Sequence, residues 1–197
     1  MGTDNQIQIQ KDPEKAISNS LRISNAEREK VITRLQTAFT EGRLNDAELD
    51  DRVMRAFNAK TVADLDPIIS DLPEETIPAM SKPASGRRKF IIGYGSRIER
   101  KGRWQVAPKI NPVIFKGHMI LDLRAAEMSR ETAINVFAYK GTLEIIVLPG
   151  VRIETHGTVY KGEWINELED EQELPGARII HIHGTAYKSK VIIRHAH

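Results

Sequence analysis

The string HGTVYKG at residues 156–162 returns as HGTAYKS at residues 183–189. Both strings contain an aromatic residue, a lysine and a small residue in succession, and a similar triplet recurs through the second half of the chain. Its aromatic residues are spaced 21, 24, 21 and 27 residues apart, and each follows a stretch rich in residues favoured in strands. The triplets are Tyr94-Gly95-Ser96, Phe115-Lys116-Gly117, Tyr139-Lys140-Gly141, Tyr160-Lys161-Gly162 and Tyr187-Lys188-Ser189.

A β repeat with a period of roughly 20–30 residues is typical of stacked coils, because one coil cannot bury its own apolar face. The small residue would permit a sharp bend, and each aromatic residue would stack on its equivalent, a contribution of roughly 0.5–1.5 kcal/mol per pair. The alternative is that the triplets are hairpin turns in a sandwich. We predict an all-β repeat domain, a β-solenoid or a rolled β-sandwich, with its repeat-core aromatics at Tyr94, Phe115, Tyr139, Tyr160 and Tyr187.

Ahead of the repeat, the sequence has helical signals instead. Ser24 and Asn45 each precede a glutamate by three residues, which is the capping-box pattern of a helix start, and apolar residues follow both at helical spacing. Gly42 is placed to end the first helix. Thr61 can cap a third, shorter helix, which Pro73 would stop. These signals predict three helices joined by tight turns.

Together, these patterns predict an α+β protein with its helices and strands in separate domains. The helical part, from Arg22 to Leu72, has eight Lys/Arg against ten Asp/Glu, whereas the β part, from Arg87 to His197, has eighteen against twelve. The two parts can therefore attract each other or face different partners. The predicted division is a disordered lead-in at residues 1–20, the three-helix domain at 21–73, a linker at 74–87 and the β-repeat domain at 88–197.

Composition excludes several classes of protein. The 197-residue chain has no cysteine, which rules out a disulfide scaffold, a cysteine nucleophile and cysteine-ligated metals. The first twenty residues lack the apolar core of a signal peptide, and no apolar run approaches the ~20 residues of a membrane helix. We therefore expect a cytoplasmic protein without a transmembrane segment, with a peripheral position at the inner face of the membrane as the alternative.

Two groups of basic residues are candidate interaction surfaces. The lysines of the repeated triplet, if stacked, would form a row that binds an anionic ligand or a solvated edge that prevents sheet aggregation. A second cluster at the start of the β domain suits acidic lipid headgroups, nucleic acid or simple solubility. The candidate residues are Lys116, Lys140, Lys161, Lys188, Arg97, Arg100, Lys101 and Arg103.

The sequence lacks the common catalytic motifs, including Gly-x-Ser-x-Gly, the phosphate-binding loop and His-Glu-x-x-His. His181 with His183, and His195 with His197, lie two residues apart, an arrangement that binds zinc or nickel only when further ligands converge. An acidic run from Glu167 to Glu173 is interpreted as a solvated loop, with a loose cation site or docking against the basic face as the alternatives. We expect no enzymatic activity, no cofactor and no metal site, and the competing hypothesis is an enzyme or a metal-dependent binder that uses the paired histidines.

Several strings in the helical part resemble a known domain. They are LRISNAEREK at residues 21–30, FTEGRL at 39–44, ELDDR at 48–52 and DLP at 71–73. The pattern is similar to the SHOCT-type short helical domain of unknown function, in the form common at the N-terminus of actinobacterial proteins.

The β half resembles the C-terminal domain of LiaF-type proteins, the cell-wall-active antibiotics response family. In that family the repeated triplet is usually Phe-Gly-Gly, whereas here the middle glycine is mostly lysine and the last triplet ends in Ser189. The string LPGVR at residues 148–152 also resembles a turn of that family. The resemblance implies a role in restraining an envelope-stress two-component system. LiaF-type proteins usually have membrane helices ahead of this domain, where this chain has the helical domain.

From these features we expect a non-enzymatic regulatory or scaffold protein that acts through protein–protein contacts in cell-envelope stress signalling. The expected partner is a membrane sensor kinase or another envelope protein, and the open ends of a β stack would also permit a homo-oligomer. The alternative is a DNA-binding transcriptional regulator that uses the helical domain. The net negative charge of that domain argues against nucleic acid, because phosphate contacts need Lys and Arg.

Overall fold

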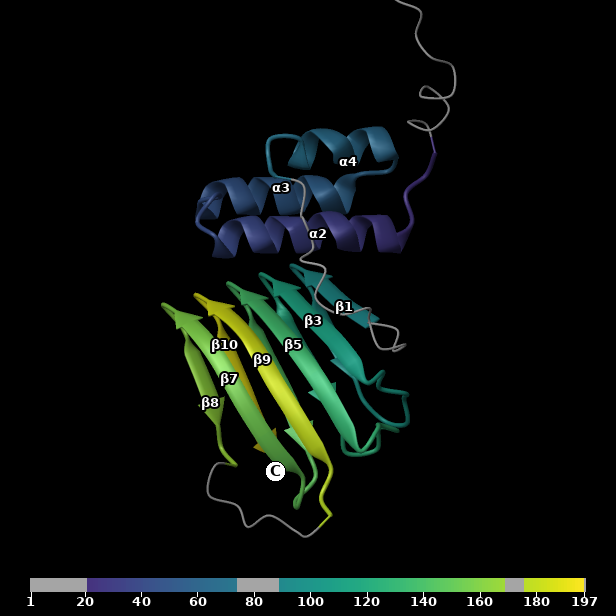
Figure 1. The fold of residues 1–197 in the computed structure, drawn as a ribbon, viewed down its shortest axis with the longest axis vertical. Coiled ribbons are helices and arrows are strands. Elements are labelled where there is room, and N and C mark those ends of the chain that lie inside the picture. Colours follow the sequence, from purple (N-terminus) through teal and green to yellow (C-terminus); the bar gives the residue numbers. More distant parts are fainter. Residues whose placement is uncertain (1–20, 74–88, 169–175, 197) are drawn as a thin grey trace, which may run out of the picture. The chain divides into compact units, whose positions relative to one another are not determined.

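The chain divides into two compact units, a helical unit at residues 1–78 and a β unit at residues 79–197 (Figure 1). The structure is a computed structural model. The predicted lead-in at residues 1–20, the predicted linker at 74–87 and the acidic run beyond Leu168 lie outside the residues that it describes. The described residues are 21–73, 89–168 and 176–196.

Three helices form the first unit, as the capping patterns predict. They are α2 (Asn25–Thr40), α3 (Asp46–Asn58) and α4 (Val62–Ile69). Ser24 and Asn45 precede the first two, and each side chain accepts a backbone hydrogen bond while the glutamate three residues later accepts one from the cap backbone. Thr61 precedes α4, which continues through Pro67. The predicted helix starts are therefore confirmed.

The helices share one apolar core and are tied together by two arginines. Arg28, from α2, donates hydrogen bonds to the carbonyl oxygens of Ala56 (2.6 Å) and Phe57 (2.5 Å) at the end of α3. Arg52 of α3 forms a two-pronged ion pair with Asp71, at 2.5 and 2.6 Å. These guanidinium groups are engaged inside the unit, which further weakens the case for phosphate binding by the helices. The buried core includes Ile32, Leu35, Leu49, Val53 and Ile68.

Two parallel five-stranded sheets form the described part of the second unit. The strands are β1 (Lys89–Tyr94), β2 (Arg97–Arg100), β3 (Lys109–Phe115), β4 (His118–Asp122), β5 (Glu131–Tyr139), β6 (Thr142–Val147), β7 (Arg152–Tyr160), β8 (Glu163–Asn166), β9 (Ile179–Tyr187) and β10 (Lys190–His195). The first sheet has the order β1-β3-β5-β9-β7 and the second has the order β2-β4-β6-β10-β8. We call each consecutive odd–even pair of strands a layer. Each repeated triplet lies at a corner, where one layer passes from the first sheet to the second.

The apolar core of this unit is built from the facing sides of the two sheets. Ile114, Ala138 and Ala186 contribute from the first sheet, and Leu143 and Val191 contribute from the second. Since successive side chains in a strand point to opposite faces, the residues between these core positions project away from the core. The histidines and ion pairs discussed below therefore lie on the outer faces of the sheets.

The layers are not stacked in the order of the sequence. The last layer, β9–β10, lies between the layers β5–β6 and β7–β8. In the first sheet β9 pairs with β5 on one side and β7 on the other, and in the second sheet β10 pairs with β6 and β8. The register brings the triplet aromatics Tyr139, Tyr187 and Tyr160 to one level. Segments far apart in the sequence are therefore direct neighbours.

Candidate interaction surface at the sheet corners

The middle residue of every triplet has a left-handed backbone conformation. The φ angle is 55° at Gly95, 51° at Lys116, 50° at Lys140, 54° at Lys161 and 47° at Lys188. Glycine adopts this conformation freely, whereas another residue is destabilised there by about 1–2 kcal/mol. Among the described residues, these four lysines are the non-glycine residues with positive φ. Four corners thus carry a backbone strain that glycine would avoid.

The last residue of every triplet must be small because neighbouring corners touch. A Cβ atom on Gly141 would lie 2.8 Å from the carbonyl oxygen of Gly117. A Cβ atom on Gly117 would collide with the backbone of Ser96, and one on Gly162 with that of Ser189. The Ser189 hydroxyl itself accepts a hydrogen bond from the amide of Gly141 (3.1 Å). Close backbone contact between layers therefore explains the glycine or serine at this position.

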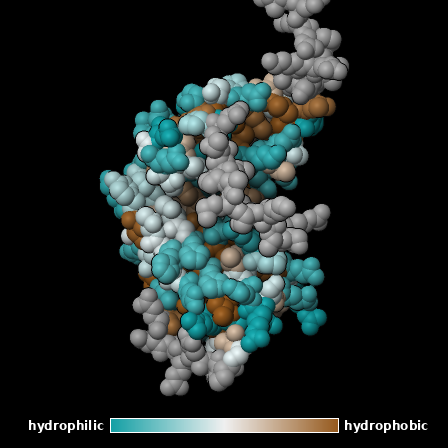
Figure 2. Space-filling view, in the orientation of Figure 1, coloured by the Kyte–Doolittle hydropathy of each residue, from teal (hydrophilic) through white to brown (hydrophobic). Residues whose placement is uncertain are grey.

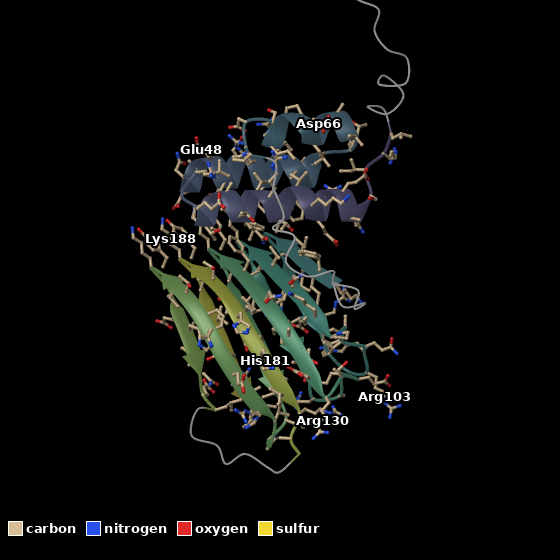
Figure 3. The ribbon with its side chains drawn as sticks, viewed as in Figure 1. Glu48, Asp66, Arg103, Arg130, His181 and Lys188 are labelled. Carbon is tan, nitrogen blue, oxygen red and sulfur yellow. The ribbon has the colours of Figure 1, made fainter. Side chains whose placement is uncertain are left out.

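Backbone hydrogen bonds hold the corners in a row. The amide of the middle residue donates to the carbonyl oxygen of the aromatic residue in the next layer, at 2.8–2.9 Å. The lysines consequently lie in the spatial order Lys116, Lys140, Lys188, Lys161, with about 4.8 Å between adjacent strands. Lys140 is half-buried and the other three are exposed. Figure 3 shows Lys188 at the ends of the strands. We call these four residues the lysine row.

The triplet aromatics stack across the layers beside the lysine row. The ring centroids of Phe115 and Tyr139 are 5.9 Å apart, those of Tyr139 and Tyr187 are 5.3 Å apart, and those of Tyr187 and Tyr160 are 5.2 Å apart. The last two pairs are parallel to within 9°. Phe115, Tyr139 and Tyr187 are buried, with exposed fractions of 1%, 0% and 8%. The residue before each of them belongs to the apolar cluster between the two sheets, so the rings point to the opposite side of their strands from that cluster. Tyr160 is 55% exposed at the sheet edge.

The ammonium groups of the lysine row lie over aromatic rings. The distance from Nζ to a ring centroid is 4.8 Å at Lys140, 5.3 Å at Lys188, 5.8 Å at Lys161 and 5.9 Å at Lys116. The ring is that of the preceding tyrosine in the first three cases and of Tyr94 in the last. Such contacts contribute roughly 0.5–1 kcal/mol each at exposed sites. They offset part of the strain and hold the charges in a line.

The second predicted basic cluster is partly neutralised. Glu99 Oε1 lies 2.7 Å from Arg97 Nε, and Glu99 Oε2 lies 3.1 Å from Lys101 Nζ. The hydrogen bonds from Arg97 and Lys101 lower the pKa of the Glu99 carboxyl from its usual value. Arg100 and Arg103 are exposed. This cluster lies along the edge strand β2 and the turn after it, and it does not continue the lysine row.

The outer face of the second sheet contains an ion-pair network that sequence patterns do not indicate. Glu144 Oε1 lies 2.7 Å from His118 Nε2, and Glu144 Oε2 lies 2.9 Å from Arg194 Nη2. Burial raises the pKa of the Glu144 carboxyl, but the hydrogen bonds from Arg194 and His118 outweigh it, so this pKa is lowered overall. The three residues come from β4, β6 and β10, and only the pairing of these strands brings them together.

The predicted histidine pairs have different surroundings. His181 lies between two carboxylates, with Nδ1 at 2.9 Å from Glu154 Oε2 and Nε2 at 3.0 Å from Glu131 Oε1. His195 Nδ1 lies 3.1 Å from a backbone carbonyl oxygen, and His197 lies outside the described residues. Figure 3 shows His181 on the face of the first sheet, away from the corners.

A cavity of about 870 Å³ lies beside the start of the first sheet. Lys89 and Glu127 are the charged residues among those described that line it. The lining residues are Lys89, Gln105, Val106, Ala107, Pro108, Glu127, Met128 and Ser129.

The space-filling view shows a mainly hydrophilic surface over the visible face of the β unit, with small apolar areas between the polar ones (Figure 2). Across the part of the chain that the structure describes, no helix has both the length and the apolar character needed to cross a membrane.

The architecture defines the class of protein: a three-helix unit followed by a unit of two parallel sheets. Residues 21–73 match the DUF1707 SHOCT-like domain family, which confirms the resemblance of the helical part. The chain is 30% identical over 177 residues to the uncharacterized protein Rv0966c of Mycobacterium tuberculosis strain H37Rv, with 86% of this chain and 88% of that protein covered. Its identity to the uncharacterized protein MT0994 of M. tuberculosis strain CDC 1551 is 30% over 180 residues, with 89% and 88% covered.

The chain therefore belongs to the same family as these mycobacterial proteins. No solved structure matches it significantly. The family match ends at residue 73, so the LiaF-type resemblance of the β half stays a prediction.

Proposed function

We propose that this chain is a non-enzymatic regulatory or scaffold protein that binds an acidic surface of a protein partner through its lysine row. The observation that carries the proposal is the left-handed backbone at Lys116, Lys140, Lys161 and Lys188. Residues that strain the backbone are concentrated where function uses their side chains.

Glycine would be the less strained choice at these corners, and the first corner does have Gly95 in the same conformation, with φ of 55°. Lysine at the other four positions is therefore not explained by the turn itself. Since adjacent strands are about 4.8 Å apart, the row presents its charges at a regular spacing. A series of carboxylates on a partner, in an extended segment or along a helix, is complementary to such a row.

The biological setting that we propose rests on the LiaF-type resemblance of the triplets and of residues 148–152. It is cell-envelope stress signalling, with a membrane sensor kinase or another envelope protein as the partner at the inner face of the membrane. We also propose that the two sheets form a short β-solenoid, because consecutive layers repeat the same corner at the same register.

The test is affinity capture from detergent-solubilised cells of the source organism, with two matched variants. Replacing all four lysines of the row with glycine removes the charges and relieves the strain, so the fold is retained. Replacing all four with arginine keeps the charge. We expect the wild type and the arginine variant to retain an envelope protein and the glycine variant to lose it. Equal retention by all three would contradict the role of the lysine row.

The DNA-binding alternative makes a different prediction in the same experiment. Retained material would then be sensitive to nuclease, and its retention would fall steeply as salt rises. Arg28 and Arg52 are engaged within the helical unit, so this outcome is not expected.

A further inference from the structure

Three histidines from two separate parts of the sequence lie together on the outer face of the first sheet. In the pairing of β7 with β9, His156 is opposite His183 and Glu154 is opposite His181. Ile180 and Ile182, between and beside the two histidines of β9, belong to the core, so the histidines project outward. The ring centroids of His156 and His183 are 5.7 Å apart, and those of His181 and His183 are 6.4 Å apart.

We propose that His156, His181 and His183 form a binding site for a divalent transition metal, with Zn²⁺ and Ni²⁺ as the chemical class. Neutral imidazole is a preferred ligand of these ions, and three histidines with an open fourth position are a known zinc ligand set. With zinc–nitrogen bonds of about 2.0 Å in a tetrahedral arrangement, two ligating rings have centroids roughly 5 Å apart. The observed separations exceed this value by about 1 Å, which side-chain rotation supplies.

The imidazoles must rotate for the metal to bind. In the present side-chain positions, the described His, Asp and Glu residues do not form a group of three that could hold a metal ion. His156 and His183 are exposed, so the surrounding chain does not hinder their rotation. His181 has a carboxylate at each ring nitrogen, Glu154 at 2.9 Å and Glu131 at 3.0 Å. One of these contacts gives way to the metal.

The carboxylate that keeps its contact with His181 would then orient this histidine as a metal ligand. A ligating histidine usually donates its second ring N–H to a carboxylate, which fixes the ring and raises its affinity for the metal. Glu131 or Glu154 is already positioned to accept that hydrogen bond from His181. Arg152 Nη2 lies 3.0 Å from Glu154 Oε1 and partly neutralises this carboxylate. Glu131 is therefore the better candidate to accept the hydrogen bond from the metal-bound His181. Glu154 is then the carboxylate that gives up its contact with His181 when the metal binds.

The stacking order of the layers creates this site. Sequence alone places His181 and His183 on one strand face but supplies no third ligand. The insertion of β9 beside β7 brings His156 next to His183, at equivalent positions of the repeated HGT strings. Had β7 and β9 been separated by another strand, the two imidazoles would be about 10 Å apart, too far to share an ion.

The test is calorimetric titration of the untagged full chain with ZnCl₂ and with NiCl₂. We expect one equivalent to bind, and His156→Ala or His183→Ala to abolish measurable binding. Glu131→Gln should weaken it about 10-fold. His118→Ala, in the other sheet, is the matched control and should bind normally. Both ligand positions are exposed, so these variants should melt like the wild type without metal.

A second control separates this site from terminal chelation. Replacing both His195 and His197 with alanine should leave binding unchanged. The proposal is overturned if that double variant alone loses the metal, if His156→Ala binds normally, or if the wild type binds neither ion at millimolar concentration. Imidazole resonances in a metal titration of the wild type give a readout without substitutions, and those of the three proposed ligands should shift together.

Discussion

Each corner of the β unit imposes two different demands on neighbouring residues. The middle position needs a positive φ, as at Lys116, and the next position needs the absence of a bulky side chain, as at Gly117. At the middle position, lysine adopts the positive φ at a cost in backbone strain. At the next position, the close contact between layers leaves room only for glycine or serine. The two positions therefore respond differently to substitution.

We predict that Gly117→Ala destabilises the β unit by about 1–3 kcal/mol, because the added methyl group collides with the backbone of Ser96. Lys116→Gly should not destabilise it comparably, since glycine relieves the strain at φ 51°. Both tryptophans, Trp104 and Trp164, lie in the β unit, so urea unfolding followed by tryptophan fluorescence measures the effect. Equal midpoints for Gly117→Ala and the wild type would show that the corners do not pack as described.

A second prediction at the residue scale concerns the acid stability of the β unit. Because the pKa of Glu144 is lowered in the folded protein, the folded state binds fewer protons, and the resulting stability is present above its usual value of 4.5. That contribution is lost as the pH falls below 4.5 through the lowered pKa. Glu144→Gln should therefore reduce the urea midpoint at pH 7, and the difference from the wild type should shrink in acid.

Glu163→Gln is the control for this pH effect, because Glu163 forms an exposed ion pair with Lys190 at 3.0 Å. Exposed pairs contribute little, so its urea midpoint should stay near that of the wild type at both pH values. A difference between Glu144→Gln and the wild type that grows in acid would contradict the proposed network.

At the scale of elements, the ends of the helices are held by side chains as well as by packing. The carbonyl groups in the last turn of a helix have no partner within the helix. In α3, the guanidinium of Arg28 supplies donors to Ala56, Phe57 and Ala59 from outside. A single planar group thus joins the start of α2 to the end of α3.

We predict that Arg28→Lys destabilises the helical unit by about 1.5–3 kcal/mol, because one ammonium group cannot reproduce the fork of donors. All described helices are in this unit, so far-ultraviolet circular dichroism measures its unfolding, while tryptophan fluorescence reports the β unit. Only the dichroism midpoint should fall. Arg55→Lys is the control, since its 3.5 Å pair with Asp51 is exposed. A similar loss in both variants would reject the specific role of Arg28.

At the scale of the whole molecule, the β unit cannot be completed until the end of the chain is present. Among the described strands, the layer β7–β8 pairs with the layer β9–β10 alone, which follows it in sequence. On its other side, the layer β9–β10 pairs with the layer β5–β6, because β9 pairs with β5 and β10 pairs with β6. β9 and β10 are therefore interior strands of the two sheets, although they are the last described strands in the sequence.

We predict opposite results for two deletions of similar length. Removing residues 177–197 takes away β9 and β10, leaves β7–β8 without a partner layer and should abolish cooperative unfolding of the β unit. Removing residues 149–175 joins β6 to β9 and leaves four layers in continuous contact, so cooperative unfolding should persist. Hydrogen exchange measured by mass spectrometry distinguishes the two. Protection of β3 to β6 that is equal in both variants would refute the central role of the last layer.

Sequence patterns predicted much of the local structure. Ser24 and Asn45 identified two helix starts because a capping box is a short-range arrangement of a side chain and a few amides. The short edge strands β2 and β8 are not indicated by composition, since each has only four residues, of which three in Arg97–Arg100 are charged and two in Glu163–Asn166 are polar or charged. β3 contains Pro112, which lacks a backbone donor and normally argues against a central strand.

The amino-acid sequence by itself determined the two-part organisation, the helix caps and the five corners, because all of these depend on residues close together in the chain. Only the tertiary structure decided the order of the layers, and with it the neighbours of every outer-face side chain. That order places His156 beside His183 and Glu144 beside Arg194. Strand pairing is decided by contacts across tens of residues, and the nearly equivalent corners allow more than one order, so local patterns do not determine it.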